Sequence, residues 1–285
     1  MTAVVPPSIW TSTCVEKLKQ DIESHRLEKR LKERFVKAMA TYHLIEDDDH
    51  ILVGLSGGKD SLLLTELLAK RARIQHPRFT VEALHVRMEN IHYETDTSYL
   101  QAFCDNLGIR LHIRTTRFEV EPSVEHPVTP SVEYSAVPQQ NTAARLRKQK
   151  QPCFLCSWNR RKQLFNLAQE LGCNKIALGH HQDDILHTAL MNLTFQGRFG
   201  TMPARLRMRK MPLTIIRPLC MMEEKDIKTY AELQGYQKQQ KLCPYESDSH
   251  RTDIKRLYEE IERMNPEARY SMWNALNADN KLIEE

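Results

Sequence analysis

Residues 51–61 read Ile-Leu-Val-Gly-Leu-Ser-Gly-Gly-Lys-Asp-Ser, and they carry the most information about the fold. The apolar run 51–55 predicts a buried strand, and the leucine-rich run that follows predicts a helix. The two adjacent glycines between them permit positive φ and allow a ligand to approach the backbone closely. A strand, a glycine turn and a helix N-terminus in this order form an anion site, because backbone N–H groups and the helix dipole converge there. We therefore predict a phosphate-binding loop over residues 56–61.

This loop is not a Walker loop, because the spacing G-x-x-x-x-G-K is absent. Its side chains still suit a phosphate chain, since Ser56 and Ser61 supply hydroxyl donors and Lys59 supplies a positive charge. The structural alternative is an ordinary turn in which Ser56 or Asp60 caps the helix. Three of the nine glycines of the chain fall in this one turn, which favours phosphate binding.

From residue 51 onward, strand and helix patterns alternate. Strands are predicted over 51–55, 79–86, 109–113, 175–179 and 213–217. Helices are predicted over 61–73, 95–107, 157–171 and 182–195. This alternation predicts an α/β fold of the Rossmann type, with a parallel sheet of about five strands flanked by helices. Ligands bind such sheets at the carboxyl ends of the strands, where the glycine loop lies.

The chain is predicted to divide into three parts. Residues 1–50 form an N-terminal helical segment, in which 15–42 carry apolar positions at helical spacing and a basic outer face. Residues 51–221 form the nucleotide-binding domain, and 222–285 form a helical C-terminal extension. The proline-rich stretch 118–151 interrupts the domain and ends in basic residues. It is predicted to be an insertion that either tracks a nucleic acid backbone or remains a solvated arm.

Composition limits the class of protein. The chain has 285 residues, 41% of them hydrophobic, which is enough for a packed core. It contains no apolar run of the roughly 20 residues that span a bilayer, and it does not begin like a secretory signal. A cytoplasmic location without membrane attachment is therefore expected. The net charge is only +4, so any binding of nucleic acid must depend on where the charges lie.

Seven unevenly spaced cysteines do not form the pattern of a disulfide framework. Cys153 and Cys156 form a C-x-x-C pair, which suits a metal or cluster, thiol chemistry or packing. No second C-x-x-C follows, so a structural zinc site lacks ligands. Cys243 is the best candidate for a third ligand, because it lies on a predicted loop beside a proline. The remaining cysteines are interpreted as packing residues.

Several segments together resemble one known family. They are SGGKDS at 56–61, the pair Cys153 and Cys156 ahead of a basic helix, ALGHHQDD at 177–184, IRPL at 216–219 and Cys243. The loop resembles the PP-loop of ATP pyrophosphatases, and the set in this order resembles the tRNA-cytidine 2-sulfurtransferase family. The resemblance covers roughly residues 30–275, and the shared order makes chance agreement improbable.

The resemblance implies an enzyme that uses ATP, Mg²⁺ and an oxygen-sensitive [4Fe–4S] cluster. Such an enzyme adenylates the C2 oxygen of an anticodon-loop cytidine, position 32 of tRNA, and replaces it with sulfur to give 2-thiocytidine. The family works as a homodimer and receives sulfur from a cysteine desulfurase. A second copy of this chain and a cysteine desulfurase are therefore expected partners, in addition to tRNA.

The resemblance also assigns residues. The nucleotide is held by Ser56, Gly57, Gly58, Lys59, Asp60, Ser61, Gly179, Asp183 and Asp184. The cluster is held by Cys153, Cys156 and Cys243. Catalytic roles fall to Lys59, Asp60, Cys153 and Cys156. Asp183 and Asp184 are expected to help hold Mg²⁺, the alternative being a helix N-cap with a dipole-matched neighbour. His180 and His181 are interpreted as structural.

The chain departs from the family at two places. Members often carry a further cysteine three residues before the last ligand, where this chain has Gln240, and the insertion 118–151 is longer than the usual link. The first departure fits a cluster held by three thiolates, with one iron lacking a protein ligand. Sulfur is then delivered either from that iron or as a persulfide on Cys153 or Cys156, and the sequence leaves both routes open.

Binding of tRNA is expected to depend on basic residues around the site. Those assigned to it are Arg160, Arg161, Lys162, Arg198 and Arg205. Other classes stay open: a uridine thiolase, a lysidine-type ligase and a small-molecule adenylating enzyme with a zinc site. A non-enzymatic RNA-binding protein is disfavoured because the loop SGGKDS is whole.

Overall fold

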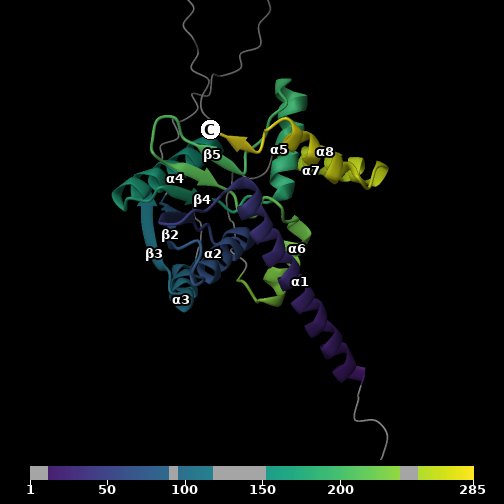
Figure 1. Cartoon of the computed structure of the whole chain (residues 1–285), viewed down its shortest axis with the longest axis horizontal. Helices are drawn as coiled ribbons and strands as arrows, with labels where there is room; N and C mark the ends of the chain where they lie inside the picture. The colour runs from purple at the N-terminus through teal and green to yellow at the C-terminus, as the bar shows by residue number, and fades with distance from the viewer. Residues whose placement is uncertain (1–11, 90–95, 118–151, 238–249) are drawn as a thin grey trace, which may run out of the picture.

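The computed structural model describes residues 12–89, 96–117, 152–237 and 250–285 (Figure 1). Its elements are, in order, α1 (Ser12–Tyr42), β1 (Asp49–Gly54), α2 (Lys59–Ala72), β2 (Phe79–Met88), α3 (Thr97–Leu107), β3 (Arg110–Thr116), α4 (Pro152–Glu170), β4 (Lys175–Ala177), α5 (Gln182–Gln196), β5 (Arg205–Arg207), β6 (Thr214–Ile216), α6 (Glu224–Leu233), α7 (His250–Met264), α8 (Ala268–Ala278) and β7 (Ile283–Glu284). The predicted insertion 118–151 and residue Cys243 lie outside the described residues.

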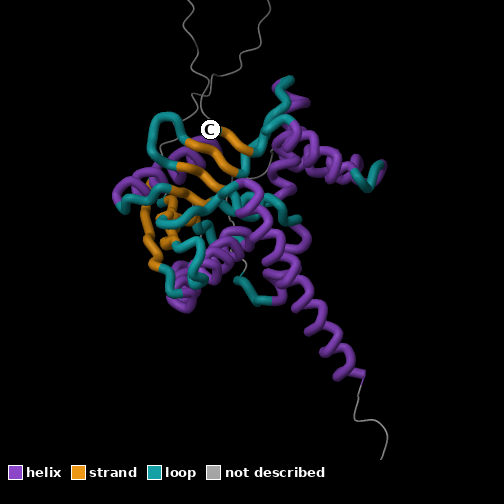
Figure 2. The backbone as a smooth tube through the Cα atoms, viewed as in Figure 1, coloured by secondary structure: helices purple, strands orange, loops and turns teal. Residues whose placement is uncertain are grey.

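The sheet has the order β3-β2-β1-β4-β6-β5-β7, and its strands lie side by side (orange in Figure 2). The first five strands in this order, β3, β2, β1, β4 and β6, are parallel to one another. They are the five predicted strands, in the order of a doubly wound nucleotide-binding sheet. The α/β fold class is therefore confirmed. The chain direction of β1 places the glycine loop at the carboxyl edge, because the loop follows this central strand directly.

The sequence prediction missed two short strands. β5 pairs antiparallel with β6, and β7 pairs with β5 at the edge of the sheet. They have three and two residues, too few to show an alternating pattern. The sheet is therefore mixed and has seven strands rather than about five. The basic segment 15–42, predicted to be helical, lies in one helix, α1.

The two faces of the sheet are covered by different helices. Leu164 and Leu167 of α4 pack with Leu52 of β1 on one face. Ile51 and Val53 of the same strand pack on the other face, against leucines of α2. Alternate residues of β1 are thus buried on opposite sides, as expected for a central parallel strand.

The C-terminal helices share the central core. Ile227 of α6, Tyr258 of α7 and Trp273 of α8 belong to the same buried cluster as Ile51 of β1. Figure 1 shows α7 and α8 beside α5 and α6 beside α1, while the N-terminal end of α1 projects beyond the body. The C-terminal helices can therefore contribute side chains to the site. None of the helices in the described ranges combines the length and the apolar character that crossing a membrane requires.

Candidate active site

The glycine loop is closed on itself by its two serines. The Ser56 N–H donates to Ser61 Oγ (3.1 Å), and Ser61 Oγ donates to the Gly58 carbonyl (2.9 Å). Gly57 has φ of 85°, in the left-handed region that favours glycine. Gly58 is the N-cap of α2, and no side chain of the described residues caps this helix. Within this part of the chain, the first N–H groups of α2 are therefore available to an anion.

Gly179 fixes where the loop sits. A Cβ at Gly179 would lie 3.1 Å from both the Asp60 carbonyl carbon and the Ser61 nitrogen. Only a glycine after β4 therefore allows the first turn of α2 to pack this closely. The sequence assigned Gly179 to the nucleotide site. The structure shows that it contacts the loop backbone.

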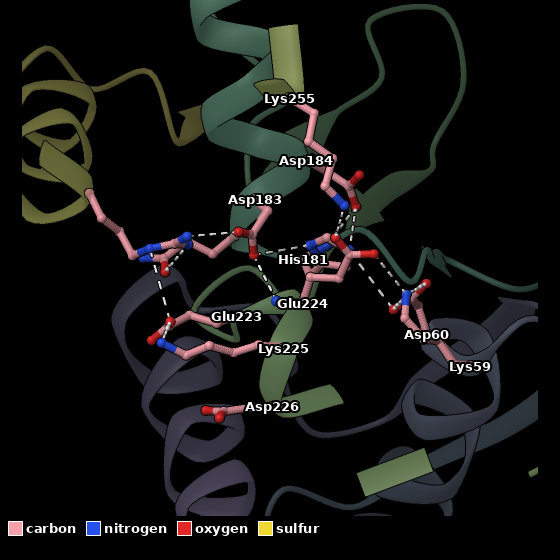
Figure 3. Close-up of polar contacts among 12 residues, drawn as sticks. Lys59, Asp60, His181, Asp183, Asp184, Glu223, Glu224, Lys225, Asp226 and Lys255 are labelled. Atoms are coloured by element: carbon pink, nitrogen blue, oxygen red, sulfur yellow. Dashed lines mark hydrogen bonds and ion pairs between the residues drawn. The ribbon is translucent and has the colours of Figure 1, made fainter. Parts of the chain in front are cut away.

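Lys59 lies in a chain of alternating charges. Its ammonium donates to the Asp60 carboxylate (3.0 Å) and to Glu224 Oε1 (3.3 Å). Lys255 of α7 donates to the other oxygen of Glu224 (2.8 Å). Burial lowers the pKa of Lys59, but Asp60 and Glu224 outweigh it, so the pKa is raised and the ammonium stays charged. Figure 3 shows these side chains meeting from α2, α6 and α7.

Asp183 is fully engaged within the protein. Its Oδ2 accepts the Glu224 N–H (2.7 Å), and its Oδ1 accepts Arg269 Nη2 (2.8 Å). Burial raises the pKa of Asp183, but His181 and Arg269 outweigh it and hold the pKa well below its usual range. Asp183 thus ties α5 to the start of α6 and to α8. Both of its oxygens have protein partners.

Asp184 differs from its neighbour. The N-cap of α5 is His181, and Asp184 at position N3 accepts the His181 N–H (3.0 Å) with one oxygen, as in a capping box. Neither aspartate is therefore the N-cap that the sequence offered as the alternative. The side chain of Asp184 is 39% exposed, whereas that of Asp183 is 11% exposed. The imidazole of His181 lies within 3.9 Å of Asp60 and 3.5 Å of Asp184. Burial lowers the pKa of His181, but these acids and Asp183 outweigh it and raise the pKa.

His180 has the opposite environment. Its Nδ1 accepts a hydrogen bond from Arg217 Nε (3.2 Å). Burial, followed by the charge of Arg217, lowers the pKa of His180 to about 3. His180 is therefore neutral at physiological pH, and its hydrogen lies on Nε2 because Nδ1 accepts. Arg217 comes from IRPL at 216–219, one of the segments that the sequence singled out.

Two pockets flank the charge chain and share Glu224 as a wall. One has a volume of about 770 Å³ and is lined by Gly57, Gly58, Lys59 and Tyr236, among others. The other has a volume of about 310 Å³ and is lined by polar and basic side chains, including Arg161, His180, Asp184, Arg251 and Lys255. The geometry thus offers one space at the glycine loop and a second, smaller space next to it.

The cysteine pair approaches the same edge of the sheet. Cys156 of α4 is half-buried and packs against Met88, the last residue of β2. Cys153 lies one turn earlier in α4. The side chains of Cys153 and Cys243 lie outside the described residues, so the structure does not test the proposed set of three ligands. Among the described residues, no group of three His, Cys, Asp or Glu side chains is placed to hold a metal ion.

The basic residues assigned to tRNA lie in different settings. Arg161 and Lys162 are exposed on α4, and Arg160 is half-buried. Arg198 is exposed after α5. Arg205 lies in β5, where its guanidinium donates to Glu285 (2.6 Å). The structure thus brings Arg161 to the smaller pocket and leaves Arg205 paired with an acid.

The sequence missed four residues of this site. They are Arg217, Glu224, Lys255 and Arg269. Only Arg217 had a local signal, because it lies in a segment shared with the family. The other three come from helices predicted to form a C-terminal extension, and nothing near them in the sequence marks a site.

A glycine loop at the carboxyl edge of a parallel sheet, followed by the N-terminus of a helix, is typical of nucleotide-binding proteins. A profile of the PP-loop domain matches residues 24–149 of the chain. The tRNA-cytidine(32) 2-sulfurtransferase of Bordetella avium (strain 197N) is 33% identical over 256 residues, 90% of this chain and 74% of that protein. The enzyme of the same name from Pseudomonas syringae pv. syringae (strain B728a) is 32% identical, over 90% and 85% of the two chains. The chain belongs to the tRNA-cytidine(32) 2-sulfurtransferase family.

A solved structure supports the fold independently. The U34-tRNA thiolase NcsA from Methanococcus maripaludis, solved with its [4Fe-4S] cluster, superimposes with a TM-score of 0.65. The match covers 90% of this chain and 79% of that one, at 23% sequence identity. At this identity the likeness shows a common fold.

Proposed function

We propose that this protein is an ATP-dependent tRNA sulfurtransferase that converts cytidine 32 of the anticodon loop to 2-thiocytidine. The observation that carries the proposal is the convergence of two features at one edge of the sheet. The glycine loop follows β1, and the helix with Cys153 and Cys156 packs its Cys156 on the end of β2. Together with the relatives' shared activity, this convergence supports an enzyme that activates an oxygen and exchanges it for sulfur.

The nucleotide half of the reaction follows from the loop. The C2 oxygen of cytosine is a poor leaving group, so it is first joined to AMP with release of pyrophosphate. The backbone N–H groups of residues 56–61 and the N-terminus of α2 bind the pyrophosphate. Lys59 stays charged and exchanges its contact with Glu224 for a phosphate oxygen. Asp60 holds the ammonium in place, which is the role we propose for this acid.

Magnesium is expected to enter with ATP. Mg²⁺ keeps several waters and is typically bound by one or two carboxylates together with substrate phosphates, so a complete protein cage is not required. Asp184 is the better ligand of the predicted pair, because its carboxylate is more exposed than that of Asp183. The hydrogen bond from the His181 N–H uses only one of its two oxygens. We assign Asp183 an orienting role, since Arg269 and the Glu224 N–H use both of its oxygens. Gly179 acts by permitting the loop position.

The target cytidine is proposed to enter the smaller pocket. Its volume of about 310 Å³ is at the lower end of ligand sites, as expected for a single nucleotide. Arg161 and Arg251 line it and suit a flanking phosphate. The neutral His180 offers an N–H donor to the base. Because Glu224 lines both this pocket and the loop pocket, we propose that the C2 oxygen and ATP bind on the two sides of this residue.

A [4Fe–4S] cluster is proposed to be held by Cys153, Cys156 and Cys243. The half-buried position of Cys156, packed on Met88 at the edge where the loop lies, fits a thiolate ligand beside the reaction site. When bound, the cluster would supply sulfur for the second half of the reaction. A set of three cysteines is compatible with this route and with a persulfide on Cys153 or Cys156, and experiment must distinguish the two.

The remaining assignments concern partners and organisation. We propose that tRNA is gripped by Arg160, Arg161, Lys162, Arg198 and Arg205, and that a cysteine desulfurase supplies the sulfur. We further propose a homodimer in the cytoplasm and the three-part division 1–50, 51–221 and 222–285. The core shared by α1, the sheet and α8 supports a close association of these parts.

Nucleoside mass spectrometry tests the function directly. tRNA from cells that lack the gene should contain no 2-thiocytidine, and the gene should restore it. A variant with Lys59→Ala should not restore it, because the pyrophosphate loses its cationic contact. If 2-thiouridine disappears instead, the protein is a uridine thiolase, and an unchanged nucleoside profile refutes tRNA thiolation.

Iron analysis tests the cluster. Protein purified without oxygen should be brown and contain iron and sulfide. Cys243→Ala should lose them or release them readily, whereas Cys173→Ala, which changes a buried packing cysteine, should retain them. An intact cluster in Cys243→Ala removes this residue from the ligand set, and a colourless zinc protein favours an adenylating enzyme of another kind.

A further inference from the structure

The outer face of α4 carries two exposed aromatic rings. Phe154 is 53% exposed and Trp158 is 51% exposed, although both are large apolar side chains. They are four residues apart, so they lie on the same face of the helix, one turn from each other. The opposite face of α4 carries Leu164 and Leu167, which are buried against the sheet. The helix is thus amphipathic in the usual sense, except that its solvent side presents rings.

These rings occupy only the first part of the outer face. Arg161 and Lys162 follow on the same side and are exposed. The Lys162 ammonium lies 5.5 Å from the centre of the Trp158 ring. A face of aromatic rings next to cations is the combination that binds unpaired nucleic acid, because rings stack on bases while cations attract phosphates.

The position of the face relates it to the reaction. Cys156 lies between the two rings in sequence and packs on Met88 at the carboxyl edge of the sheet. Arg161, one turn further along α4, lines the pocket of about 310 Å³. A nucleotide in that pocket therefore has neighbours in the RNA chain close to α4. When one base leaves a loop to react, adjacent bases lose stacking partners, and an exposed ring can replace them.

We propose that Trp158, with Phe154 beside it, is a stacking platform for unpaired bases of the RNA loop that contains the target cytidine. This inference rests on the proposed function, since it assumes an RNA substrate. The platform is an uncharged contact with RNA, in addition to the basic residues that were already assigned to tRNA binding. A protein partner would be expected to cover these rings with apolar surface, whereas the adjoining Arg161 and Lys162 complement a polyanion.

The test compares two RNAs and three variants. The RNAs are an anticodon stem–loop and a duplex of equal charge without unpaired bases, and binding is measured by fluorescence anisotropy over a range of salt. Trp158→Ala should weaken binding of the stem–loop by about 5-fold to about 150-fold, which corresponds to the loss of one stacked base. Its salt dependence should not change, because no charge is removed. The duplex should bind equally well to both proteins.

The other two variants separate stacking from charge. Trp158→Phe should keep most of the affinity, because a ring remains. Lys162→Met should reduce the slope of log K against log salt by about 0.7–0.9 if the lysine contacts one phosphate. Iron content is measured in each variant, and binding is compared at equal iron content. A loss of affinity that is caused by a disturbed Cys156 is thereby distinguished from a loss of stacking.

Three outcomes overturn the inference: stem–loop binding by Trp158→Ala within twofold of wild type, an equal loss on the duplex, or a change in oligomeric state on size-exclusion chromatography. The last would assign the rings to an interface between copies of the chain. The proposed function fails separately, if the wild-type protein neither binds tRNA nor thiolates it. If the wild-type protein thiolates tRNA and Trp158→Ala binds the stem–loop as well as the wild type does, only the stacking proposal is refuted.

Discussion

The two walls of the candidate site are built on opposite principles. At the glycine loop, charged side chains are paired with one another, as in the chain from Lys59 through Glu224 to Lys255. On α4, Arg161 and Lys162 face solvent beside exposed rings. The first wall is pre-organised before any ligand binds, which suits a small substrate that must be placed accurately. The second wall presents charge and aromatic surface to the outside, which suits a large polyanion.

The difference also concerns what a substitution should do. A paired charge that is largely buried, such as Asp183 beside the loop wall, cannot be removed without weakening the network around it, so changes there should affect folding and chemistry. An exposed charge on α4 costs little stability when it is removed, so changes there should affect RNA binding alone. Substitutions and a change of pH separate the two walls, and the effect on the buried ion pair should exceed the effect on the exposed helix.

The largest effect is expected from Asp183→Asn. Arg269 would lose its ion pair with Asp183 at 2.8 Å but keep the one with Glu262 at 2.9 Å. The loss of unfolding free energy should therefore lie toward the lower end of the about 3–5 kcal/mol that is typical of a broken buried ion pair. Urea unfolding followed by circular dichroism measures the loss. Asp184→Asn is the matched control, since this more exposed side chain keeps an oxygen for the His181 N–H and should cost less than about 1 kcal/mol. Equal losses in the two variants would show that Asp183 is not the structural link between α5 and α8.

Gly179→Ala should impair chemistry more than folding. The new Cβ would lie 3.1 Å from the backbone of Asp60 and Ser61, so the loop must shift. A small displacement of a positioned substrate costs on the order of 100-fold in rate. Release of pyrophosphate in the presence of tRNA measures this. At Gly200, by contrast, a Cβ would meet only a side-chain atom of Arg198 at 3.6 Å, so Gly200→Ala should react at nearly the wild-type rate.

Acid should destabilise the protein through His180. Its folded pKa of about 3 is lower than its unfolded value near 6.5, so the unfolded state binds more protons as the pH falls below 6.5. Stability should therefore drop as pH falls, by on the order of 2 kcal/mol from pH 7 to pH 5. Urea midpoints at the two pH values measure the drop. His180→Gln should flatten it, and an equally steep dependence in this variant would place the titrating group elsewhere.

The smallest effect is expected on α4. Arg161→Gln should leave the urea midpoint unchanged and lower the salt slope of tRNA binding by about 0.7–0.9, the loss of one phosphate contact. Arg205→Gln should lower the slope less, because Glu285 already balances that guanidinium. If Arg205 gave the larger change, the RNA would lie over β5 rather than over α4.

Sequence reasoning recovered most of the fold and part of the site. Strand and helix patterns are local, so the five parallel strands and their helices could be predicted. β5 and β7 could not, because three and two residues show no period and their pairing depends on distant partners. In the site, residues 56–61 were evident from their own spacing. The predicted equivalence of Asp183 and Asp184 did not reveal that one is buried in an ion pair and the other is exposed.

A glycine loop between a buried strand and a helix can be predicted from the sequence, because glycine conformations and apolar periodicity are properties of neighbouring residues. Tertiary packing, in contrast, brings Glu224 to Lys59 from 165 residues away and Arg269 to Asp183. Those contacts exist because α6, α7 and α8 pack into the same core as the sheet. The pairing of charges follows from the packing of apolar faces, which no short stretch of the chain encodes.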